Sequence, residues 1–354
     1  MKKIFSLICM AILAMSFVAC SNDDGLGAEY NRASTISVVK SDVLFSAAAG
    51  TGSIVVKAQG PIALSSSSEW CKVTALNDST IEVSVDNNES NMGRSSLLTI
   101  KSGIDSVNVT VQQQGFYLQT GMGTAIAYGD DSVRKAYAFS TSGSPVITST
   151  EDWLTATVEG DSLVVTAEAN ETGHVRRGYV KYAFGEFKDS VMVSQYDFEK
   201  DLAGDYYFCY YKSNGKSTYM SAELKMKDGK PVIYLPKYYG FNIPVTIDNT
   251  CKLSIAEGAD IGTCPASDGT SFYVAIVLGN SAANRVTWRG GRASYSASFK
   301  YNKTSGTYAM FKDNGSWKYK VDYMSFYYFK SNTFASADLK GNLVDMYSPY
   351  LMKK

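Results

Sequence analysis

The amino-acid sequence predicts an all-β protein with three folded domains, and three observations lead to this prediction. Short runs of β-branched and aromatic residues are separated by clusters of Gly, Asn, Asp and Ser, without a helical period between them. Residues 35–115 and 116–197 carry the same landmarks in the same order, which indicates a tandem repeat. Residues 200–354 differ in composition, because they contain 18 of the 25 tyrosines.

The N-terminal residues predict export. Two lysines follow Met1, and residues 4–17 form an apolar run that is too short and wrongly flanked for a membrane-spanning helix. Small residues and Cys20 end this run, which resembles the lipobox of bacterial lipoproteins. In that family the cysteine becomes the new N-terminus and its thiol carries a diacylglycerol. The next four residues resemble the short acidic export signal of Bacteroidota lipoproteins: Ser21, Asn22, Asp23 and Asp24.

This resemblance implies residues 1–19 as signal peptide and residues 20–34 as a lipidated tether. It further implies an outer-membrane protein that is held by lipid on Cys20 and exposed at the cell surface. A position on the periplasmic side of that membrane remains an alternative, as does plain secretion with a cysteine that happens to sit at the cleavage point.

The charge balance favours separate domains and excludes an obvious nucleic-acid partner. Formal net charge is zero, with 34 basic and 34 acidic residues. Residues 1–199 hold 14 Lys/Arg and 22 Asp/Glu, whereas residues 200–354 hold 20 and 12. Solvated surface charge explains the basic half, since its lysines are scattered, but an anionic ligand remains an alternative.

Four cysteines remain in the mature chain, and export places them where disulfides can form. Cys251 and Cys264 are close enough in sequence to close one loop, so they are the predicted pair. Cys71 follows Trp70 and is expected to be a small buried apolar residue. No Cys-x-x-Cys motif occurs and only one histidine is present, so we expect no metal site.

The repeat is anchored on a tryptophan. Residues 66–70, which end in Trp70, reappear as residues 149–153, a shift of 83. The same shift relates three further pairs: Asn87 to Asn170, Arg94 to Arg177, and Gln112 to Gln195. Short alternating strands at this spacing predict an immunoglobulin-like β-sandwich for each copy. Trp70 and Trp153 are then expected in the core, with a stacking platform for sugars as the alternative role.

These landmarks resemble those of the BACON domain, a module common in Bacteroidota surface and periplasmic proteins. The resemblance rests on the opening at residues 44–47, the Trp, the Asn, the downstream Arg and the closing Val-x-Val-x-Gln. It implies an immunoglobulin-like fold and either a carbohydrate- or mucin-binding role or a spacer role. The second copy lacks a clear Leu-x-Phe opening, and its residues 182–185 depart from a regular strand pattern.

The last domain, residues 198–354, reads as antiparallel β. Residues 202–208 form an apolar anchor, a glycine and a strand, and turn dipeptides such as Asp228-Gly229 and Asn314-Gly315 separate the later strands. Asn314-Gly315 is predicted to be a hairpin turn. The domain is either a barrel or a sandwich, and its opening strand resembles that of lipocalin-like barrels.

Aromatic residues in expected turns of this domain are the candidate ligand site. Flat Tyr and Trp rings can lie against the apolar faces of pyranoses while neighbouring polar groups pair with hydroxyls. The alternative is that tyrosines simply cover a β surface, where they are favoured anyway. The candidates are Tyr238, Tyr239, Trp288, Arg289, Arg292 and Trp317.

Nothing in the sequence predicts catalysis or a cofactor. His174, the only histidine, lies in an expected loop, and no Gly-x-Ser-x-Gly elbow occurs. Gly290-Gly291 lacks the context of a phosphate loop. We therefore expect no enzyme, no catalytic residue and no cofactor.

The predicted function is a monomeric, non-catalytic lipoprotein that binds a glycan, either polysaccharide or mucin-type, with the sandwiches as spacer or stalk. This hypothesis predicts exposed aromatic residues grouped on one face of residues 200–354. A structural or adhesive protein that contacts a protein partner is the alternative, and it predicts buried rings with a flat apolar patch or an open strand edge outside. A carboxylate-based hydrolase is the third hypothesis, and it needs two carboxylates roughly 5–9.5 Å apart in a cleft.

Overall fold

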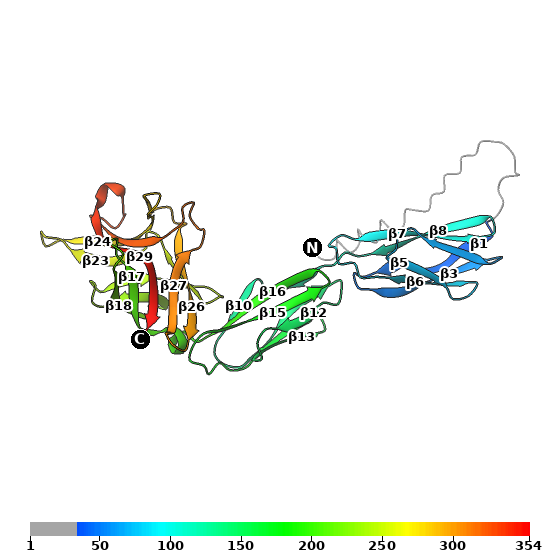
Figure 1. The fold of residues 1–354 in the computed structure, drawn as a ribbon, viewed down its shortest axis with the longest axis horizontal. Coiled ribbons are helices and arrows are strands. Elements are labelled where there is room, and N and C mark those ends of the chain that lie inside the picture. The colour runs from blue at the N-terminus through cyan, green and yellow to red at the C-terminus, as the bar shows by residue number, and fades with distance from the viewer. Residues whose placement is uncertain (1–33) are drawn as a thin grey trace. The chain divides into compact units, whose positions relative to one another are not determined.

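The computed structural model describes residues 34–354 and is almost entirely β-structure (Figure 1). The predicted lipidation site, Cys20, and the predicted export signal, Ser21, Asn22, Asp23 and Asp24, lie outside the described residues. Within the described chain, no helix has the length and apolar character needed to cross a membrane. The all-β prediction is therefore confirmed.

The described chain divides into two compact units. The first holds most of the first copy of the repeat, in residues 34–44, 50–86 and 95–112. The second contains residues 45–49 and 87–94 together with everything from Gln113 to Lys354. The second copy of the repeat and the Tyr-rich domain therefore belong to one unit.

The first copy is a sandwich of two four-stranded sheets. In β6 every second residue is buried, because one face of the strand packs on the opposite sheet. One sheet has the order β1-β3-β6-β5: Ile36–Asp42, Gly50–Ala58, Thr80–Val85 and Cys71–Ala75. The other has the order β2-β8-β7-β4: Leu44–Phe45, Asp105–Gln113, Arg94–Ser102 and Ile62–Ser66.

The second copy has the same two-sheet plan. One sheet has the order β13-β14-β11-β9: Leu154–Glu159, Ser162–Ala167, Val133–Thr141 and Leu118–Thr120. The other has the order β10-β16-β15-β12: Ala125–Tyr128, Phe187–Gln195, Arg176–Phe184 and Val146–Ser149. Tyr182 is buried within β15, so the unusual segment at residues 182–185 continues a regular strand up to Phe184.

The repeat keeps its shift of 83 only as far as the tryptophan, and this corrects the predicted equivalences. Eleven positions separate Trp70 from Ile81, but ten separate Trp153 from its counterpart Leu163, so the later shift is 82. The counterparts seen in the structure are Asn88 and Asn170, Arg94 and Arg176, and Gln113 and Gln195. A single deletion in the turn before β14 explains the change, because turns tolerate length variation.

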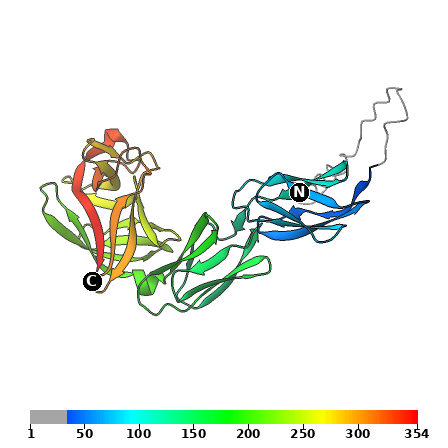
Figure 2. The ribbon, with the colours of Figure 1, turned by 45° about the vertical axis from the view of Figure 1, so that its right-hand side comes forward.

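The Tyr-rich domain is a nearly closed barrel-like sheet, in which β20 and β21 stand at opposite ends of the strand order (Figure 2). Because these two strands follow each other in the chain, they bring the ends of the sheet together. The order is β20-β19-β18-β17-β29-β27-β26-β22-β21: Phe241–Pro244, Lys230–Leu235, Ser217–Lys227, Gly204–Tyr211, Leu339–Lys353, Gly306–Asp313, Ser294–Asn302, Lys252–Ala256 and Thr246–Ile247.

Four more strands extend this sheet through the N-terminal half of β29, to which β28 is paired. They are β23 (Asp260–Pro265), β24 (Ser271–Asn280), β25 (Arg285–Thr287) and β28 (Tyr323–Phe329). Two short helical segments, Phe198–Leu202 and Ser336–Asp338, complete the domain.

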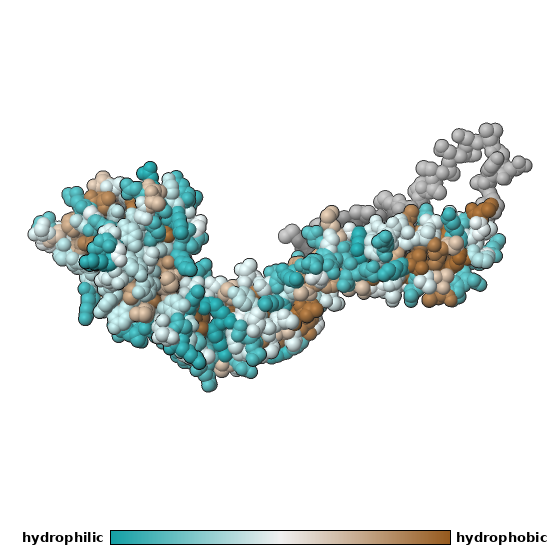
Figure 3. Space-filling view, in the orientation of Figure 1, coloured by the Kyte–Doolittle hydropathy of each residue, from teal (hydrophilic) through white to brown (hydrophobic). Residues whose placement is uncertain are grey.

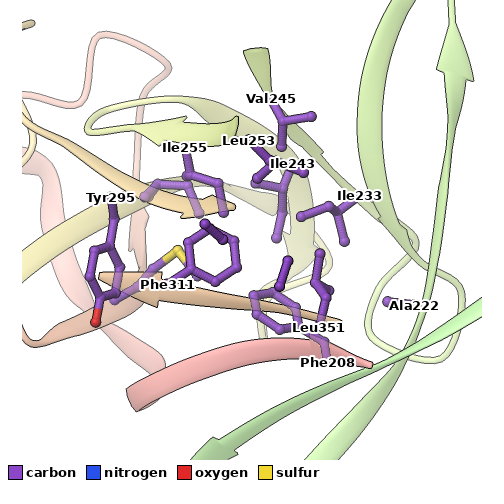
Figure 4. Packing of buried hydrophobic residues seen from close by; sticks show 14 of the residues in the cluster. Phe208, Ala222, Ile233, Ile243, Val245, Leu253, Ile255, Tyr295, Phe311 and Leu351 are labelled. Atoms are coloured by element: carbon purple, nitrogen blue, oxygen red, sulfur yellow. The ribbon is translucent and has the colours of Figure 1, made fainter. Parts of the chain in front are cut away.

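The interior of the barrel is filled with side chains. Figure 4 shows residues from different strands pointing toward one another, among them Phe208, Ile255 and Phe311. Each fully buried side chain of this size contributes about 1.5–3 kcal/mol relative to exposure. A ligand therefore has to bind on the outside of the barrel or at its rim.

Two turn dipeptides behave differently. Asp228-Gly229 joins β18 to β19 with both residues at positive φ, 52° and 72°, as a tight hairpin requires. Asn314-Gly315 begins a longer loop between β27 and β28, which pair with other strands, so its hairpin prediction is wrong.

The predicted disulfide is not formed. Cys71, Cys209, Cys251 and Cys264 are all free and buried. β22 pairs with β26 whereas β23 pairs with β24, so the segment between Cys251 and Cys264 is not a hairpin that would set the two thiols opposite each other. Burial raises the pKa of the Cys251 thiol to about 12, which makes it unreactive.

Candidate binding surface

The two predicted tyrosines, Tyr238 and Tyr239, differ in their surroundings. Tyr238 is half-buried beside Phe241 and Phe326, and its hydroxyl donates to the Leu343 carbonyl at 3.3 Å. Burial raises the pKa of Tyr238 to about 12. Tyr239, at φ 54°, is 54% exposed. Only Tyr239 therefore presents most of its ring to solvent.

The two predicted tryptophans are half-buried by their own domain. Trp288 Nε1 donates to the Phe334 carbonyl at 3.0 Å, and its ring lies about 6 Å from those of Tyr327 and Phe329. Trp317 packs against the barrel core and has an edge contact with Tyr319 at 5.0 Å. Among the described residues, no ring contact joins Tyr238, Trp288 and Trp317 to one another.

The predicted arginines lie before Ala293, on the loop that leads into β26. Arg289 and Arg292 are both exposed. The carboxylate of Glu257 accepts from the backbone N–H groups of Arg292 and Ala293, at 3.0 and 3.1 Å, and from the hydroxyl of Thr287. Glu257 is thus occupied in holding this loop, while the guanidinium groups remain at the surface.

Other aromatic residues, which the sequence did not single out, gather on the outside of the barrel. In β17, Tyr206, Phe208 and Tyr210 belong to the core, so the alternate residues Tyr207 and Tyr211 lie outside. The same alternation operates in β27, where Ala309 and Phe311 are buried. It places Tyr308 and Met310 on the outer side.

Strand register collects these side chains into two adjacent rows across six neighbouring strands, β18-β17-β29-β27-β26-β22. The first row is Tyr219, Cys209, Tyr350, Met310, Ser298 and Lys252. The second row is Ser221, Tyr207, Met352, Tyr308 and Lys300. Each row therefore ends at a lysine, and aromatic and thioether groups form its middle part.

We call the aromatic and thioether part of this surface the outer wall; it consists of Tyr207, Tyr219, Tyr308, Met310, Tyr350 and Met352. Tyr219 is 59% exposed and Met310 50% exposed, and the other four side chains are half-buried. Tyr207 and Tyr219 meet edge to face at 4.8 Å. The side of the barrel that faces the viewer in Figure 3 is mostly white and teal with small brown areas, so it carries no large hydrophobic patch.

A hollow of about 400 Å³ adjoins the outer wall, and three lysines line it. We call it the lysine pocket; its lining is Lys252, Ser296, Ser298, Lys300, Tyr308, Met310, Lys312, Asp313 and Asn314. A volume of this size is within the range of small-molecule sites. Tyr308 and Met310 belong to both the pocket and the outer wall.

The polar groups of the lysine pocket are partly fixed. Asn314 Nδ2 donates to the hydroxyl of Ser296 at 2.8 Å, and this hydroxyl lies 2.7 Å from that of Ser254. Lys252 approaches Asp248 at 3.7 Å. Within residues 34–354, Lys300 and Lys312 take part in no ion pair, so their charges are available to a ligand.

The repeat landmarks of the sandwiches serve packing. Asn88 and Asn170, both buried, donate to backbone carbonyls four residues ahead, and Arg94 and Arg176 donate to the amides of Gln113 and Gln195. The guanidinium of Arg176 also lies 4.3 Å from the ring centre of Trp153.

The tryptophans of the two sandwiches are half-buried and not fully enclosed. Trp153 packs against the core of its sandwich on one side and meets Arg176 on the other. The expected place of Trp153 at the core is therefore confirmed, but the sheets bury the ring only in part, because it lies at the start of a strand where the Arg176 guanidinium covers its other side.

His174 and Asp313, two groups that a catalytic site could use, are both held by other contacts. The ring of His174 stacks on Tyr301 at 3.8 Å. Asp313 is the single carboxylate of the lysine pocket, and its Oδ1 accepts from the Val321 backbone N–H at 3.0 Å. In the part of the chain that the structure describes, no three His, Cys, Asp or Glu side chains cluster as a metal site would require.

The solved structures that match this chain include tandem immunoglobulin domains. The I9–I11 tandem from titin is 10% identical, covers 46% of this chain and 65% of its own, and has a TM-score of 0.32. The I67–I69 fragment from titin is 7% identical, with 83% and 93% covered and a TM-score of 0.27. An endo-fucoidan hydrolase from glycoside hydrolase family 107 is 11% identical, with 48% and 35% covered and a TM-score of 0.23. No curated protein matches the chain.

The family model that matches is described as "BACON: Putative binding domain, N-terminal", and it matches residues 62–114 and 143–196. The first match spans β4 to β8 and the second spans β12 to β16, so each covers most of one sandwich. The match includes the second copy, despite its missing Leu-x-Phe opening. Both sandwiches therefore match the BACON model, and the resemblance seen in the sequence is confirmed for these two segments.

Proposed function

We propose that the protein is a non-catalytic surface lipoprotein that binds a glycan through the outer wall of its barrel. The BACON domains are then a spacer between the barrel and the membrane, and the lipid on Cys20 is the anchor. The observation that carries this proposal is the outer wall itself, in which four tyrosines and two methionines from four adjacent strands lie on one exposed side.

The chemistry of the outer wall suits sugars. A pyranose offers C–H groups on its faces and hydroxyls around its rim, so it needs flat rings beside short polar groups. Tyrosine supplies both a ring and a hydroxyl with little conformational freedom to lose. Ser221 lies beside Tyr207 at the end of the second row, and Ser298 lies beside Met310 in the first row. Both serine hydroxyls can pair with hydroxyl groups of a bound sugar.

A protein partner is the second candidate, and the two methionines favour it. Met310 and Met352 are adjacent across β27 and β29, with Tyr308 and Tyr350 as their direct partners. Flexible thioether side chains adapt to varied protein surfaces.

The first experiment is a glycan array probed with the soluble chain from Ser21 to Lys354. Wild type is compared with Tyr350→Ala and Tyr308→Ala in the outer wall, and with Trp288→Ala, Trp317→Ala and Tyr239→Ala at the positions predicted from sequence. Tyr179→Ala, an exposed tyrosine on β15 of the second sandwich, is the matched control.

Binding that the outer-wall variants lose and the control keeps supports the proposal. Loss only in Trp288→Ala or Trp317→Ala moves the site to the loops. Equal binding by all variants, or no binding by folded wild type, contradicts the proposal for the glycans on the array.

A further inference from the structure

We propose that the ligand of the barrel is an acidic polysaccharide, and that the lysine pocket takes its carboxylate or sulfate groups. This inference rests on the proposed glycan binding and adds the chemical class of the ligand. It starts from the fact that the pocket is not merely a hollow beside the rings but a cationic one.

The three lysines surround one serine. Lys252 on β22 is the direct cross-strand partner of Ser298 on β26. Lys300 lies two residues along β26 from Ser298, and Lys312 on β27 is the partner of Ser296, two residues the other way. Two residues along a strand span about 7 Å, and paired residues on neighbouring strands are about 5 Å apart. Lys300 and Lys312 are therefore about 15 Å apart at the backbone with Lys252 between them, a span over which long lysine side chains can contact one or more acidic groups of a polymer.

The positive charges of this pocket are only partly compensated, because three lysines face two carboxylates, Asp248 and Asp313. Lys252 has Asp248 at 3.7 Å, but Lys300 and Lys312 have no ion pair among the described residues. The single carboxylate of the lining, Asp313, is held by a backbone N–H through its Oδ1. A net positive hollow attracts anions at low and moderate ionic strength. The excess of 20 basic over 12 acidic residues in residues 200–354 acts in the same direction.

The floor of the pocket can complete the recognition of an anion. The hydroxyl of Ser298, an exposed residue, has no hydrogen-bond partner within residues 34–354 and is free to donate. Lysine ammonium and serine hydroxyl groups are both donors, which carboxylate and sulfate oxygens require. A neutral sugar would leave Lys300 and Lys312 without a charged partner.

The pocket and the outer wall are continuous, which favours a polymer over a small anion. Tyr308 and Met310 line the pocket, and their neighbours across β29 are Met352 and Tyr350. A chain that lies on the rings can therefore extend an acidic group into the pocket. Small anions would use the lysines without the outer wall.

The test compares polymers that differ only in charge. Affinities of the soluble chain from Ser21 to Lys354 are measured for four matched pairs. The pairs are dextran and dextran sulfate, methyl-esterified and de-esterified homogalacturonan, desulfated and sulfated chondroitin, and mucin after and before sialidase treatment. The acidic member of at least one pair is expected to bind ten-fold or more tightly than its neutral or less charged partner.

Two sets of variants separate a site from general attraction to polyanions. Lys300→Gln/Lys312→Gln removes two charges from the pocket, and Lys227→Gln/Lys230→Gln removes two from exposed positions at the β18–β19 hairpin of the same domain. The pocket variant is expected to lose ten-fold or more in affinity for the acidic polymer, and the hairpin variant less than two-fold. Tyr350→Ala is expected to weaken binding as well.

The outcomes distinguish this inference from the proposed function. Equal binding of both members of every pair, with loss in Tyr350→Ala alone, overturns the acidic ligand and keeps glycan binding. Equal losses of affinity for the acidic polymer in the pocket and hairpin variants overturn the lysine pocket as the site of its acidic groups. Absence of binding to all eight polymers, with circular dichroism showing folded protein, contradicts both.

Discussion

The second sandwich and the barrel are built from the same kind of alternating strand, yet they use their polar and aromatic residues in opposite ways. In the second sandwich the repeat landmarks bind other parts of the same domain: Asn170 and Gln195 donate to backbone carbonyls, and the Arg176 guanidinium covers Trp153. The barrel has a core that is complete without Tyr207, Tyr308 or Tyr350, which face outward. The repeat landmarks of the sandwich therefore serve stability. The outward tyrosines of the barrel, which the core does not need, are the better candidates for binding.

If the sandwich landmarks serve stability, replacing them should lower the free energy of unfolding, and we expect the largest loss at Asn170. Its Nδ2 donates to Asp130 Oδ1 and the His174 carbonyl, both at 3.1 Å, and the side chain is 4% exposed. Asn170→Ala removes the donor to the buried Asp130 Oδ1 and leaves the His174 carbonyl with the Thr172 hydroxyl alone, so it should lower the free energy of unfolding by about 2–4 kcal/mol. Urea unfolding followed by Trp fluorescence measures it. Asn108→Ala, at an exposed position of β8, is the control and should change stability by less than about 0.5 kcal/mol; equal effects would refute the contrast.

Arg176 and Arg177 are neighbours in the chain, but Arg176 contacts its own sandwich whereas Arg177 contacts the barrel. Arg177 donates to the carbonyls of Thr250, Cys251 and Phe299 in the barrel, at 2.8–3.2 Å, and so fastens β15 to the barrel. Arg177→Ala should lower the free energy of unfolding by about 1–3 kcal/mol. It should also separate the melting transition of the second sandwich from that of the barrel. Arg176→Ala should destabilise the sandwich while the barrel transition keeps its temperature. Differential scanning calorimetry distinguishes the two, and identical thermograms would contradict the assigned roles.

The outer wall should respond in the reverse way, with binding affected and stability spared. Tyr350→Ala removes a ring that the barrel core does not include, so we expect at least ten-fold weaker glycan binding, about 1.4 kcal/mol, and a melting temperature within a few degrees of wild type. Isothermal titration with the best array ligand provides the affinity. A variant that unfolds and binds equally poorly would show that the ring is structural after all.

A buried carboxyl at the start of the barrel gives the smallest and most specific effect. Burial raises the pKa of Asp201 to about 6, helped by the nearby Asp130, while the Asp197 backbone N–H opposes the shift. Its Oδ1 is buried without a hydrogen-bond partner, its Oδ2 accepts from the Asp197 N–H, and Lys353 Nζ donates to its backbone carbonyl.

Because the folded state holds this proton more tightly than the unfolded state, the contribution of Asp201 to stability falls as pH rises from about 4 through 6. Asp201→Asn removes this loss, so the variant should gain about 1 kcal/mol relative to wild type between pH 5.5 and 7.5. Urea unfolding at the two pH values measures the difference. The exposed Asp205→Asn serves as control, and parallel behaviour of all three proteins would contradict the assignment.

Much of the fold could be predicted from local patterns, and the binding surface could not. Period-two alternation marked the strands, and Asp228-Gly229 marked a hairpin that the structure contains. Asn314-Gly315 carried the same signal but lies in a loop whose flanking strands pair elsewhere. The predicted site emphasised aromatic residues in turns, whereas the tyrosines that form a surface lie within strands. Outward positions such as Tyr207, between the inward Tyr206 and Phe208, were the available signal.

The all-β class, the tandem repeat and the BACON resemblance of both copies could be predicted from the sequence, because alternation, turn dipeptides and repeat landmarks are properties of neighbouring residues. Strand pairing became visible only in the three-dimensional fold. It separated Cys251 from Cys264, changed the repeat shift from 83 to 82, and set Tyr350 beside Met310 and Lys252 beside Ser298. These relations depend on register between strands far apart in the chain, where a slip of one residue turns every side chain to the other face.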